Sequence, residues 1–438
     1  MSLVWALPFA GILASIALAP LLAPAAWSRH YGKIAAFWTA AFALPFAAMH
    51  GIGAALHELL HAALLEYLPF VLLLGALYIV AGGVRLTGTL RGTPAVNTLL
   101  LLFGTLAASV AGTTGAAMLL VRPLVRANRR RRHKRHVFVF LILLVANIGG
   151  ALSPLGDPPL FLGFLQGVPF FWPTRHLVLP MMFTSAVLLA LFHALDSWHH
   201  RRAPYPDPSP LAEVEKLRVE GKANLALLAA ILAVIAASGA WQPAPELVVL
   251  GVVVPLPQLV ADLLLAAIGL LSLRLTEARI RDLNEFEWHP MEEVAILFAA
   301  IFVTIIPVLA MLRAGEAGPA AALLPLLNPG GMPNDRAYFW ATGLLSAVLD
   351  NAPTYLLFFS SAGGDVATLT GPLASTLLAI SAGAVFFGAL TYIGNAPNFI
   401  VKSIAESAGI KMPGFFAYIA WSAALLLPIF AAVTVLFL

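Results

Sequence analysis

The chain has 438 residues, of which 61% are hydrophobic and only 11% are Asp, Glu, Lys or Arg. Soluble globular chains carry roughly 25% charged residues, so these charges are too few to cover two or three soluble cores. The absence of cysteine excludes disulfides, thiolate metal sites, iron–sulfur clusters and cysteine nucleophiles. Composition therefore predicts a polytopic membrane protein.

Ten continuous apolar stretches are predicted to cross the bilayer as helices, each of which needs about 20 residues. They cover approximately residues 3–26, 34–50, 62–84, 137–168, 176–195, 223–241, 247–273, 291–312, 373–401 and 413–438. Two further stretches, 95–124 and 337–362, are interrupted by polar and turn residues. We expect these two to enter and leave on the same side. The predicted fold is all-α, with about ten transmembrane spans plus two re-entrant hairpins.

In this topology the basic residues gather on one side of the membrane. Of the 25 Lys and Arg residues, all but Arg175, Arg313 and Arg336 fall there. The positive-inside rule assigns that side to the cytoplasm and both termini to the outside. The basic run at 129–136 is interpreted as an anchor for anionic lipid of the inner leaflet, and not as a nucleic-acid site. No Lys or Arg precedes stretch 3–26, which is therefore interpreted as a first span, not a signal peptide.

One long polar, proline-rich stretch, residues 196–222, is predicted to be a cytoplasmic linker between two halves. Before it, residues 1–90 are expected to form N-terminal scaffold spans and residues 91–195 a first repeat with a hairpin and a broken helix. After it, residues 223–330 are expected to form a second scaffold part. Residues 331–438 then form a second repeat with its own hairpin, broken helix and last span.

The two halves carry related motifs. Residues 150–162 (GALSPLGDPPLFL) and residues 388–400 (GALTYIGNAPNFI), 238 positions later, are identical at six of thirteen positions. Upstream, TTGAAMLL at 113–120 aligns with DNAPTYLL at 350–357 at an offset of 237. The first broken stretch opens towards the cytoplasm and the second towards the outside, so the repeats are inverted. Inverted repeats with interrupted helices are typical of the central site of secondary transporters.

Four segments rich in Gly and Pro interrupt these repeats. They are GTTG at 112–115, SPLGDPP at 153–159, LDNAP at 349–353 and YIGNAPN at 392–398. Unpaired backbone groups in hydrocarbon cost several kcal/mol each, so such breaks persist only inside protein or beside a polar ligand. Hairpin arms of about 10 to 15 residues reach about 15 to 22 Å, which is short of the roughly 30 Å core. The hairpin tips are therefore predicted near the midplane.

The polar groups expected at this centre offer oxygen or amide. They are Thr113, Thr114, Asn147, Ser153 and Asp157 from the first repeat, and Asp350, Asn351, Thr354, Thr391, Asn395 and Asn398 from the second. Hard cations such as Na⁺ bind carboxylate, carbonyl and hydroxyl oxygen, and an intramembrane carboxylate indicates function. We predict a cation-binding site with Asp157 and Asp350 as the sodium ligands. Helix capping is the alternative role for Ser153, Thr354 and Asn398.

The sequence HELLH at 57–61 matches the H-E-x-x-H zinc pattern. An intramembrane zinc metalloprotease is therefore a remote alternative. The motif precedes the apolar run at 62–84, on the flank expected to face the outside, where His and Glu also serve as interfacial anchors. We favour the anchor interpretation, without an enzyme activity.

Several of these motifs together resemble a known family. The stretch from TTGAAMLLVRPLVRANRR through ANIGGALSPLGDPPLFLGF, with LDNAPTYLLFF and TYIGNAPNFIVKSIAE, is similar to bacterial NhaD-type sodium/proton antiporters and related citrate transporters of the ion transporter superfamily. The resemblance covers most of the chain from about residue 55. It implies a homodimer in the bacterial inner membrane, with a scaffold domain and a transport domain that moves as an elevator.

The resemblance also implies cation sites between each hairpin tip and the neighbouring helix break. Carried over residue by residue, it assigns Thr113, Thr114, Asn147 and Asp157 to one site, and Asp350, Asn351, Asn395 and Asn398 to the other. The better-known carboxylate symporters have a Ser-Asn-Thr triplet at these tips, whereas this chain has GTTG and LDNAPT.

The leading hypothesis is sodium/proton antiport, in which Na⁺ and H⁺ compete for the same aspartates. The alternative is a Na⁺-coupled citrate or dicarboxylate symporter, in which helix N-termini at the hairpins would hold the anion. Neither hypothesis requires a cofactor, because Na⁺ is the transported or coupling ion. The expected partners are sodium, protons, membrane lipid and, in the symporter, a small carboxylate.

Overall fold

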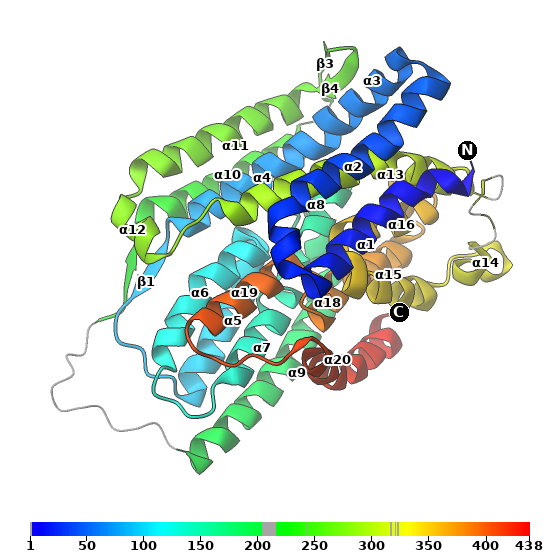
Figure 1. The fold of residues 1–438 in the computed structure, drawn as a ribbon. Coiled ribbons are helices and arrows are strands. Elements are labelled where there is room, and N and C mark those ends of the chain that lie inside the picture. Colours follow the sequence, from blue (N-terminus) through cyan, green and yellow to red (C-terminus); the bar gives the residue numbers. More distant parts are fainter. Residues whose placement is uncertain (1, 204–215, 242, 316–317, 320, 322–323) are drawn as a thin grey trace.

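The computed structural model describes residues 2–203, 216–241, 243–315, 318–319, 321 and 324–438. It is built almost entirely of helices (Figure 1). Within the described residues, ten helices are long and apolar enough to cross a membrane. The prediction of a helical, multi-pass membrane protein with about ten spans is therefore confirmed.

In the first half of the chain, the helices follow one another with few strands. They are α1 (Leu7–Leu22), α2 (Pro24–His50), α3 (Ile52–Ala62), α4 (Leu68–Gly82), α5 (Pro94–Ala111), α6 (Thr113–Ala127), α7 (Arg135–Leu144), α8 (Pro158–Leu165) and α9 (Trp172–Arg202). A π-helical turn, Ala63–Tyr67, joins α3 to α4, and 3-10 turns cover Leu3–Ala6 and Ile148–Leu152.

The second half repeats this helical pattern. Its helices are α10 (Lys222–Ala240), α11 (Leu256–Leu275), α12 (Ala278–Leu283), α13 (His289–Arg313), α14 (Leu324–Leu327), α15 (Asp335–Leu349), α16 (Asn351–Ser361), α17 (Val366–Thr370), α18 (Ala374–Phe387), α19 (Ala396–Ser407) and α20 (Phe415–Phe437), with 3-10 turns at Pro329–Gly331 and Gly388–Leu390. Two antiparallel strand pairs complete the fold, β1 (Arg85–Thr87) with β2 (Arg218–Glu220) and β3 (Glu246–Val249) with β4 (Val252–Pro255).

Nine of the ten long apolar helices overlap predicted spans, and one predicted span is exchanged for α5. Helix α5 has 18 residues and is about 27 Å long, so it is longer than the expected hairpin arm. Conversely, the predicted span 373–401 is divided between α18, of 14 residues, and α19. In the predicted span 247–273, the first residues form the β3–β4 hairpin, whose turn residues Leu250 and Gly251 both have positive φ. Hydropathy misplaced these boundaries because it measures apolarity and not backbone conformation.

Helix α7 explains where the core lies. It is apolar on all sides, and its residues from His136 to Leu144 are all buried. A helix without a polar face lies in a protein core or in lipid, and the burial of these residues shows that α7 is surrounded by protein. Around it pack α5, α6, α9 and α19 (Figure 1). Helix α4 packs against α10 and α11 and also against α6, and α13 packs against α2 and α16.

The predicted linker begins later than expected. Helix α9 continues to Arg202, so residues 196–202 are helical. Residues 204–215 lie outside the described residues, and β2 follows them. Strand β2 is held by Glu220, which accepts hydrogen bonds from Arg85 at 3.1 Å and from Arg279 at 3.1 Å. These two arginines, Arg85 first, hold the pKa of Glu220 below its ordinary value.

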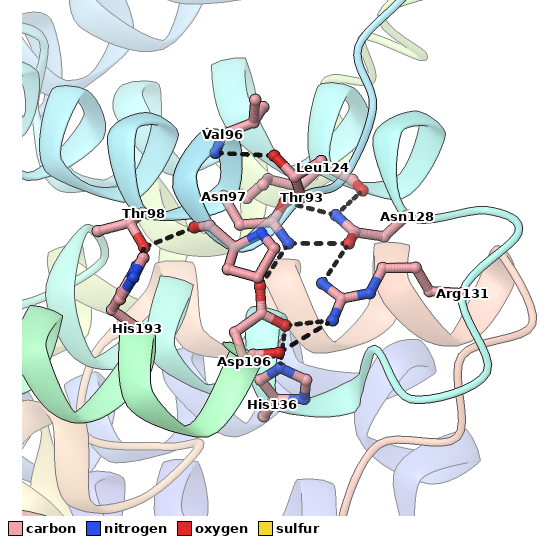
Figure 2. A network of polar contacts seen from close by, with 11 residues as sticks. Thr93, Val96, Asn97, Thr98, Leu124, Asn128, Arg131, His136, His193 and Asp196 are labelled. Carbon is pink, nitrogen blue, oxygen red and sulfur yellow. Dashed lines mark hydrogen bonds and ion pairs between the residues drawn. The ribbon is translucent and has the colours of Figure 1, made fainter. Parts of the chain in front are cut away.

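A buried charged cluster connects α5, α7 and α9 (Figure 2). At its centre Asp196 accepts hydrogen bonds from Arg131 at 2.5 Å, from His136 at 2.8 Å and from Asn97 at 3.0 Å. Asn97 also exchanges two hydrogen bonds with Asn128, of 3.0 and 2.9 Å. All five side chains are buried. We call these five residues the Asp196 cluster.

The Asp196 cluster changes the interpretation of the basic run at 129–136. Arg129, Arg130 and Arg132 are exposed, as an anchor for lipid headgroups requires. Arg131 and His136 instead point inward, where Arg131 forms an ion pair with Asp196 and His136 hydrogen-bonds to the same carboxylate. The run therefore has an exposed part, Arg129, Arg130 and Arg132, and a buried structural part, Arg131 and His136.

Candidate functional site

The two hairpin tips have the same backbone geometry. Gly112 separates α5 from α6 with φ 76° and ψ 150°, and Asp350 separates α15 from α16 with φ 111° and ψ 141°. Thr113 and Asn351 then begin the second helix of each pair. The structure thus makes Gly112 equivalent to Asp350, and Thr113 equivalent to Asn351. The offset is 238, the same as between residues 150–162 and residues 388–400. The sequence alignment of Thr113 with Asp350 was wrong by one residue.

This correction makes Asp350 unusual. Positive φ with extended ψ is a region that glycine adopts freely and that strains other residues. The first repeat has glycine at this position, whereas the second has an aspartate, whose side chain accepts a 3.0 Å hydrogen bond from the Ala352 amide. A residue kept in a strained conformation, at a helix break, is a candidate for a functional role.

The helix breaks also correspond. Asp157 precedes α8 and Asn395 precedes α19, both with extended backbone. Within each break the chain folds back on itself, and a Cβ added to Gly156 would lie 2.1 Å from the Gly150 carbonyl oxygen. Only glycine permits that approach, and Gly394 lies in the same way against Gly388.

Asp157 is the point where both repeats meet. Its Oδ1 accepts hydrogen bonds from Thr113 Oγ1 at 3.0 Å and from Asn395 Nδ2 at 2.9 Å. Its Oδ2 accepts one from Asn351 Nδ2 at 2.5 Å. All four residues are buried. The structure therefore joins residues from both sets that the resemblance assigns to separate sites.

Asn351 has an unused acceptor in this cluster. Its Oδ1 is buried and has no hydrogen-bond partner among the described residues. An orphaned buried acceptor costs roughly 1 to 3 kcal/mol unless a ligand or water satisfies it. Asn351 and Asp157, whose oxygens have the chemistry that suits a hard cation, both line one cavity.

The cavity has a volume of about 70 Å³, which suits an ion or a few waters. Both hairpin tips line it, including Thr114 and Asp350, and Leu73, Tyr78 and Met291 close it from α4 and α13. Among the residues described, no Lys, Arg or His lines this cavity. Its two aspartates therefore have no cationic side chain beside them there.

The other predicted site residues support the broken backbone. Thr391 Oγ1 donates to the Ala347 carbonyl at 2.6 Å, and Ser153 Oγ donates to the equivalent carbonyl, that of Ser109. These two hydroxyls join each break to the neighbouring hairpin. Thr354 Oγ1 donates to the Asp350 carbonyl at 2.7 Å, within the second tip.

Asn147 and Asn398 are connected to Asp157 through Asn395. Asn147 donates to Asn398 Oδ1 at 2.8 Å and accepts a 3.4 Å hydrogen bond from Asn395. Asn398 donates to the carbonyls of Gly388 and Thr391. Both residues thus position Asn395, which in turn contacts Asp157.

Sequence reasoning missed the wall that α4 and α13 contribute. Tyr78, Pro290 and Met291 line the cavity, but no spacing or polar pattern distinguishes them from lipid-facing residues. What distinguishes them is their position in the fold, because Pro290 in the first turn of α13 lines the same cavity as the hairpin tips.

The HELLH motif lies on α3, and none of its residues lines this cavity. The rings of His57 and His61 are 6.5 Å apart, and the described residues contain no group of three His, Cys, Asp or Glu suited to a metal. A catalytic zinc site uses three protein ligands. We predict that the purified protein binds no stoichiometric zinc and that the double variant His57→Ala/His61→Ala keeps a near-normal rate of cation transport. One equivalent of zinc by mass spectrometry, lost in the double variant, would contradict this prediction.

Comparison with known proteins identifies the family. The whole chain, residues 1–438, matches the family described as "Putative citrate transport". An uncharacterized transporter of Mycobacterium bovis and one of Mycobacterium tuberculosis are each 26% identical to it over 366 residues, which is 77% of this chain and 78% of each relative. The chain therefore belongs to this citrate-transport family of membrane transporters, in keeping with the ten long apolar helices found among the described residues.

Proposed function

We propose that this transporter exchanges Na⁺ for H⁺ at Asp157, with Asp350 as a second carboxylate, in the manner of the NhaD-type antiporters that its motifs resemble. The observation that carries the proposal is the buried Asp157 carboxylate beside the unsatisfied Asn351 oxygen, in a cavity whose described lining has no cationic side chain. A cation placed there would have carboxylate, amide and hydroxyl oxygens as ligands. A protonated carboxylate offers the cation less charge, so Na⁺ and H⁺ compete.

The proposed cycle uses the two repeats as a unit. Because Asp157 contacts Thr113, Asn351 and Asn395, an ion at Asp157 would be held by both hairpin tips and both helix breaks. The cavity lies between these elements and the wall of α4 and α13. Movement of the repeats along this wall, as in an elevator, would expose the ion to each side in turn. The re-entrant position of the hairpins, a homodimeric scaffold and an inner-membrane location with both termini outside are parts of the same proposal.

A second candidate function is Na⁺-coupled transport of citrate or a dicarboxylate, which the family's description favours. The cavity of about 70 Å³ is well below the roughly 300 to 1,000 Å³ of pockets that enclose organic ligands. A symporter would therefore need a more open state than the one described here.

Reconstitution distinguishes the two functions. Proteoliposomes that contain a pH dye receive NaCl first and citrate afterwards. Antiport predicts sodium-driven proton movement without citrate. Uptake of labelled citrate that requires Na⁺, with no proton movement on NaCl alone, would instead establish the symporter.

The strained tip offers a separate prediction. Asp350→Gly removes both the charge and the strained Cβ, whereas Asp350→Ala removes the charge and keeps the strain. We expect neither variant to transport. The apparent melting temperature should be equal to or above wild type for Asp350→Gly and lower for Asp350→Ala. The free energies of unfolding of the two variants should differ by about 1 kcal/mol. Equal melting temperatures of the two variants, measured by tryptophan fluorescence, would contradict a strained tip.

A further inference from the structure

One ion pair connects the first hairpin to the loop between α12 and α13. Arg122 lies on α6, nine residues after Thr113, and its Nη2 is 3.0 Å from Glu285 Oε2. The Arg122 side chain is 12% exposed and that of Glu285 is 69% exposed. One turn later on α6, Arg126 donates to the Leu86 carbonyl of β1 at 2.6 Å. One end of α6 is thus tied to two segments outside the hairpin.

The loop between α12 and α13 is itself held to the end of α4. Asn284 Nδ2 donates hydrogen bonds to the carbonyls of Gly82 and Val84, each of 2.9 Å. Tyr78, one turn before the end of α4, donates from its hydroxyl to the Glu287 carbonyl at 2.7 Å. An ion pair to this loop is therefore an attachment to α4.

Glu285 has a left-handed backbone conformation, with φ 46°. Residues other than glycine adopt this conformation rarely, because their Cβ crowds the backbone. A side chain held this way at a contact between two elements is a candidate for a functional role. Here the strained residue is the one that reaches the hairpin.

The first hairpin tip lies against the last turns of α4. A Cβ added to Gly112 would lie 3.5 Å from Leu77, and one added to Gly115 would lie 2.8 Å from Ala81, the last residue but one of α4. Pro290, in the first turn of α13, lines the same cavity as the tip. The predicted topology places the end of α4 and the start of α13 at the cytoplasm. In that topology the tip occupies the cytoplasmic end of its wall.

Displacement of the tip away from this end would break the ion pair. Arg122 is seven residues, or about 10 Å of helix, beyond Gly115. Moving α6 by that distance along α4 would bring Arg122 from Glu285 to the present place of Gly115. The neighbours of that place are the side chains of Ala81 and Ala111, and a charge without a partner is unfavourable there. The ion pair and the apolar wall both favour the described position.

We propose that Arg122 and Glu285 form a latch that holds the first hairpin at the cytoplasmic end of α4, and that each transport cycle breaks and remakes it. The latch rests on the proposed function, since it requires hairpins that move along α4 and α13. It sets the share of molecules in each position and takes no part in ion binding. Loss of either charge should therefore increase the share of molecules whose hairpin has left this end.

Distances between two spin labels test the latch without a transport assay. The chain has no cysteine, so Arg130→Cys, just past α6, and Asp282→Cys, on α12, supply the only labelled positions. Both residues are exposed. Double electron–electron resonance of this labelled full chain in lipid nanodiscs should give one dominant distance. Arg122→Gln and Glu285→Gln should each increase the share of a second, distinct distance about five-fold.

Arg279→Gln is the matched control, because it removes a 3.1 Å ion pair with Glu220 that involves no hairpin, and it should leave the distances unchanged. The exchanged pair Arg122→Glu/Glu285→Arg should restore the single dominant distance, which a fold defect in either single variant would not allow. Unchanged distances in both single variants, no recovery in the exchanged pair, or an equal change in Arg279→Gln would overturn the latch. A second distance in a protein whose proteoliposomes move no protons on NaCl would keep the latch and refute only the antiport.

Discussion

Asp157→Asn is expected to abolish sodium/proton exchange while the protein stays folded. The amide keeps the size of the side chain, and its oxygen still accepts from Thr113 or Asn395. It loses the charge for which Na⁺ and H⁺ compete. Asp350→Asn should abolish exchange for the same reason. The measurement is ²²Na⁺ uptake into proteoliposomes driven by an outward proton gradient.

A matched control comes from Asp365, an exposed aspartate that caps α17 by accepting from the Thr368 amide at 2.8 Å. Asp365→Asn makes the same chemical change at a helix N-terminus outside the cavity and should keep wild-type uptake. Wild-type rates in both Asp157→Asn and Asp350→Asn would eliminate the carboxylate mechanism. Loss in Asp365→Asn as well would show that the assay reports folding, not ion binding.

Asp196→Asn should cause the largest loss of stability of any single substitution discussed above. It removes the carboxylate charge that compensates the buried Arg131, and the new amide places an NH2 donor where one of the two oxygens accepts from Arg131, His136 or Asn97. Removing one partner of a buried ion pair costs about 3 to 5 kcal/mol. We expect the yield of monodisperse protein in size-exclusion chromatography to collapse.

Glu220 provides the comparison, since it is also bound by two arginines but near the surface. Glu220→Gln should change the melting temperature little, because exposed ion pairs contribute about 0 to 1 kcal/mol. Asp196→Asn/Arg131→Gln should recover part of the yield, since the uncompensated charge is removed. No recovery in the double variant, or an equal loss in Glu220→Gln, would contradict the role assigned to the Asp196 cluster.

The helix breaks could be predicted from sequence because Gly and Pro act locally. Pro158 and Pro397 each lie in the first turn of a helix, as expected of proline, and Gly112 forms a tip. The repeat identified Asp157 and Asn395 as equivalent residues. The tip register was missed because sequence matching compares side chains, whereas the equivalence of Gly112 and Asp350 lies in their φ and ψ angles.

Interactions between distant residues were the part that sequence could not supply. Arg131 and Asp196 are 65 residues apart, and neither neighbourhood signals the other. The same holds for Asn351 and Asp157, which are 194 residues apart. Asn351 and Asp157 were predicted as candidate residues of the central site. Only the packing of the two repeats shows that the Asp157 carboxylate accepts hydrogen bonds from residues of both repeats.

The hydrogen bond between Asp157 and Asn395 bears on how such a site could arise. These residues occupy equivalent positions in the two repeats and touch at 2.9 Å. In a dimer of two identical half-length ancestors, both would have to be aspartates, which would repel, or both asparagines, which would carry no charge. Gene duplication and fusion release that symmetry, since each copy can then mutate alone. An acid paired with its amide counterpart is therefore an arrangement open to a fused chain and closed to a symmetric dimer.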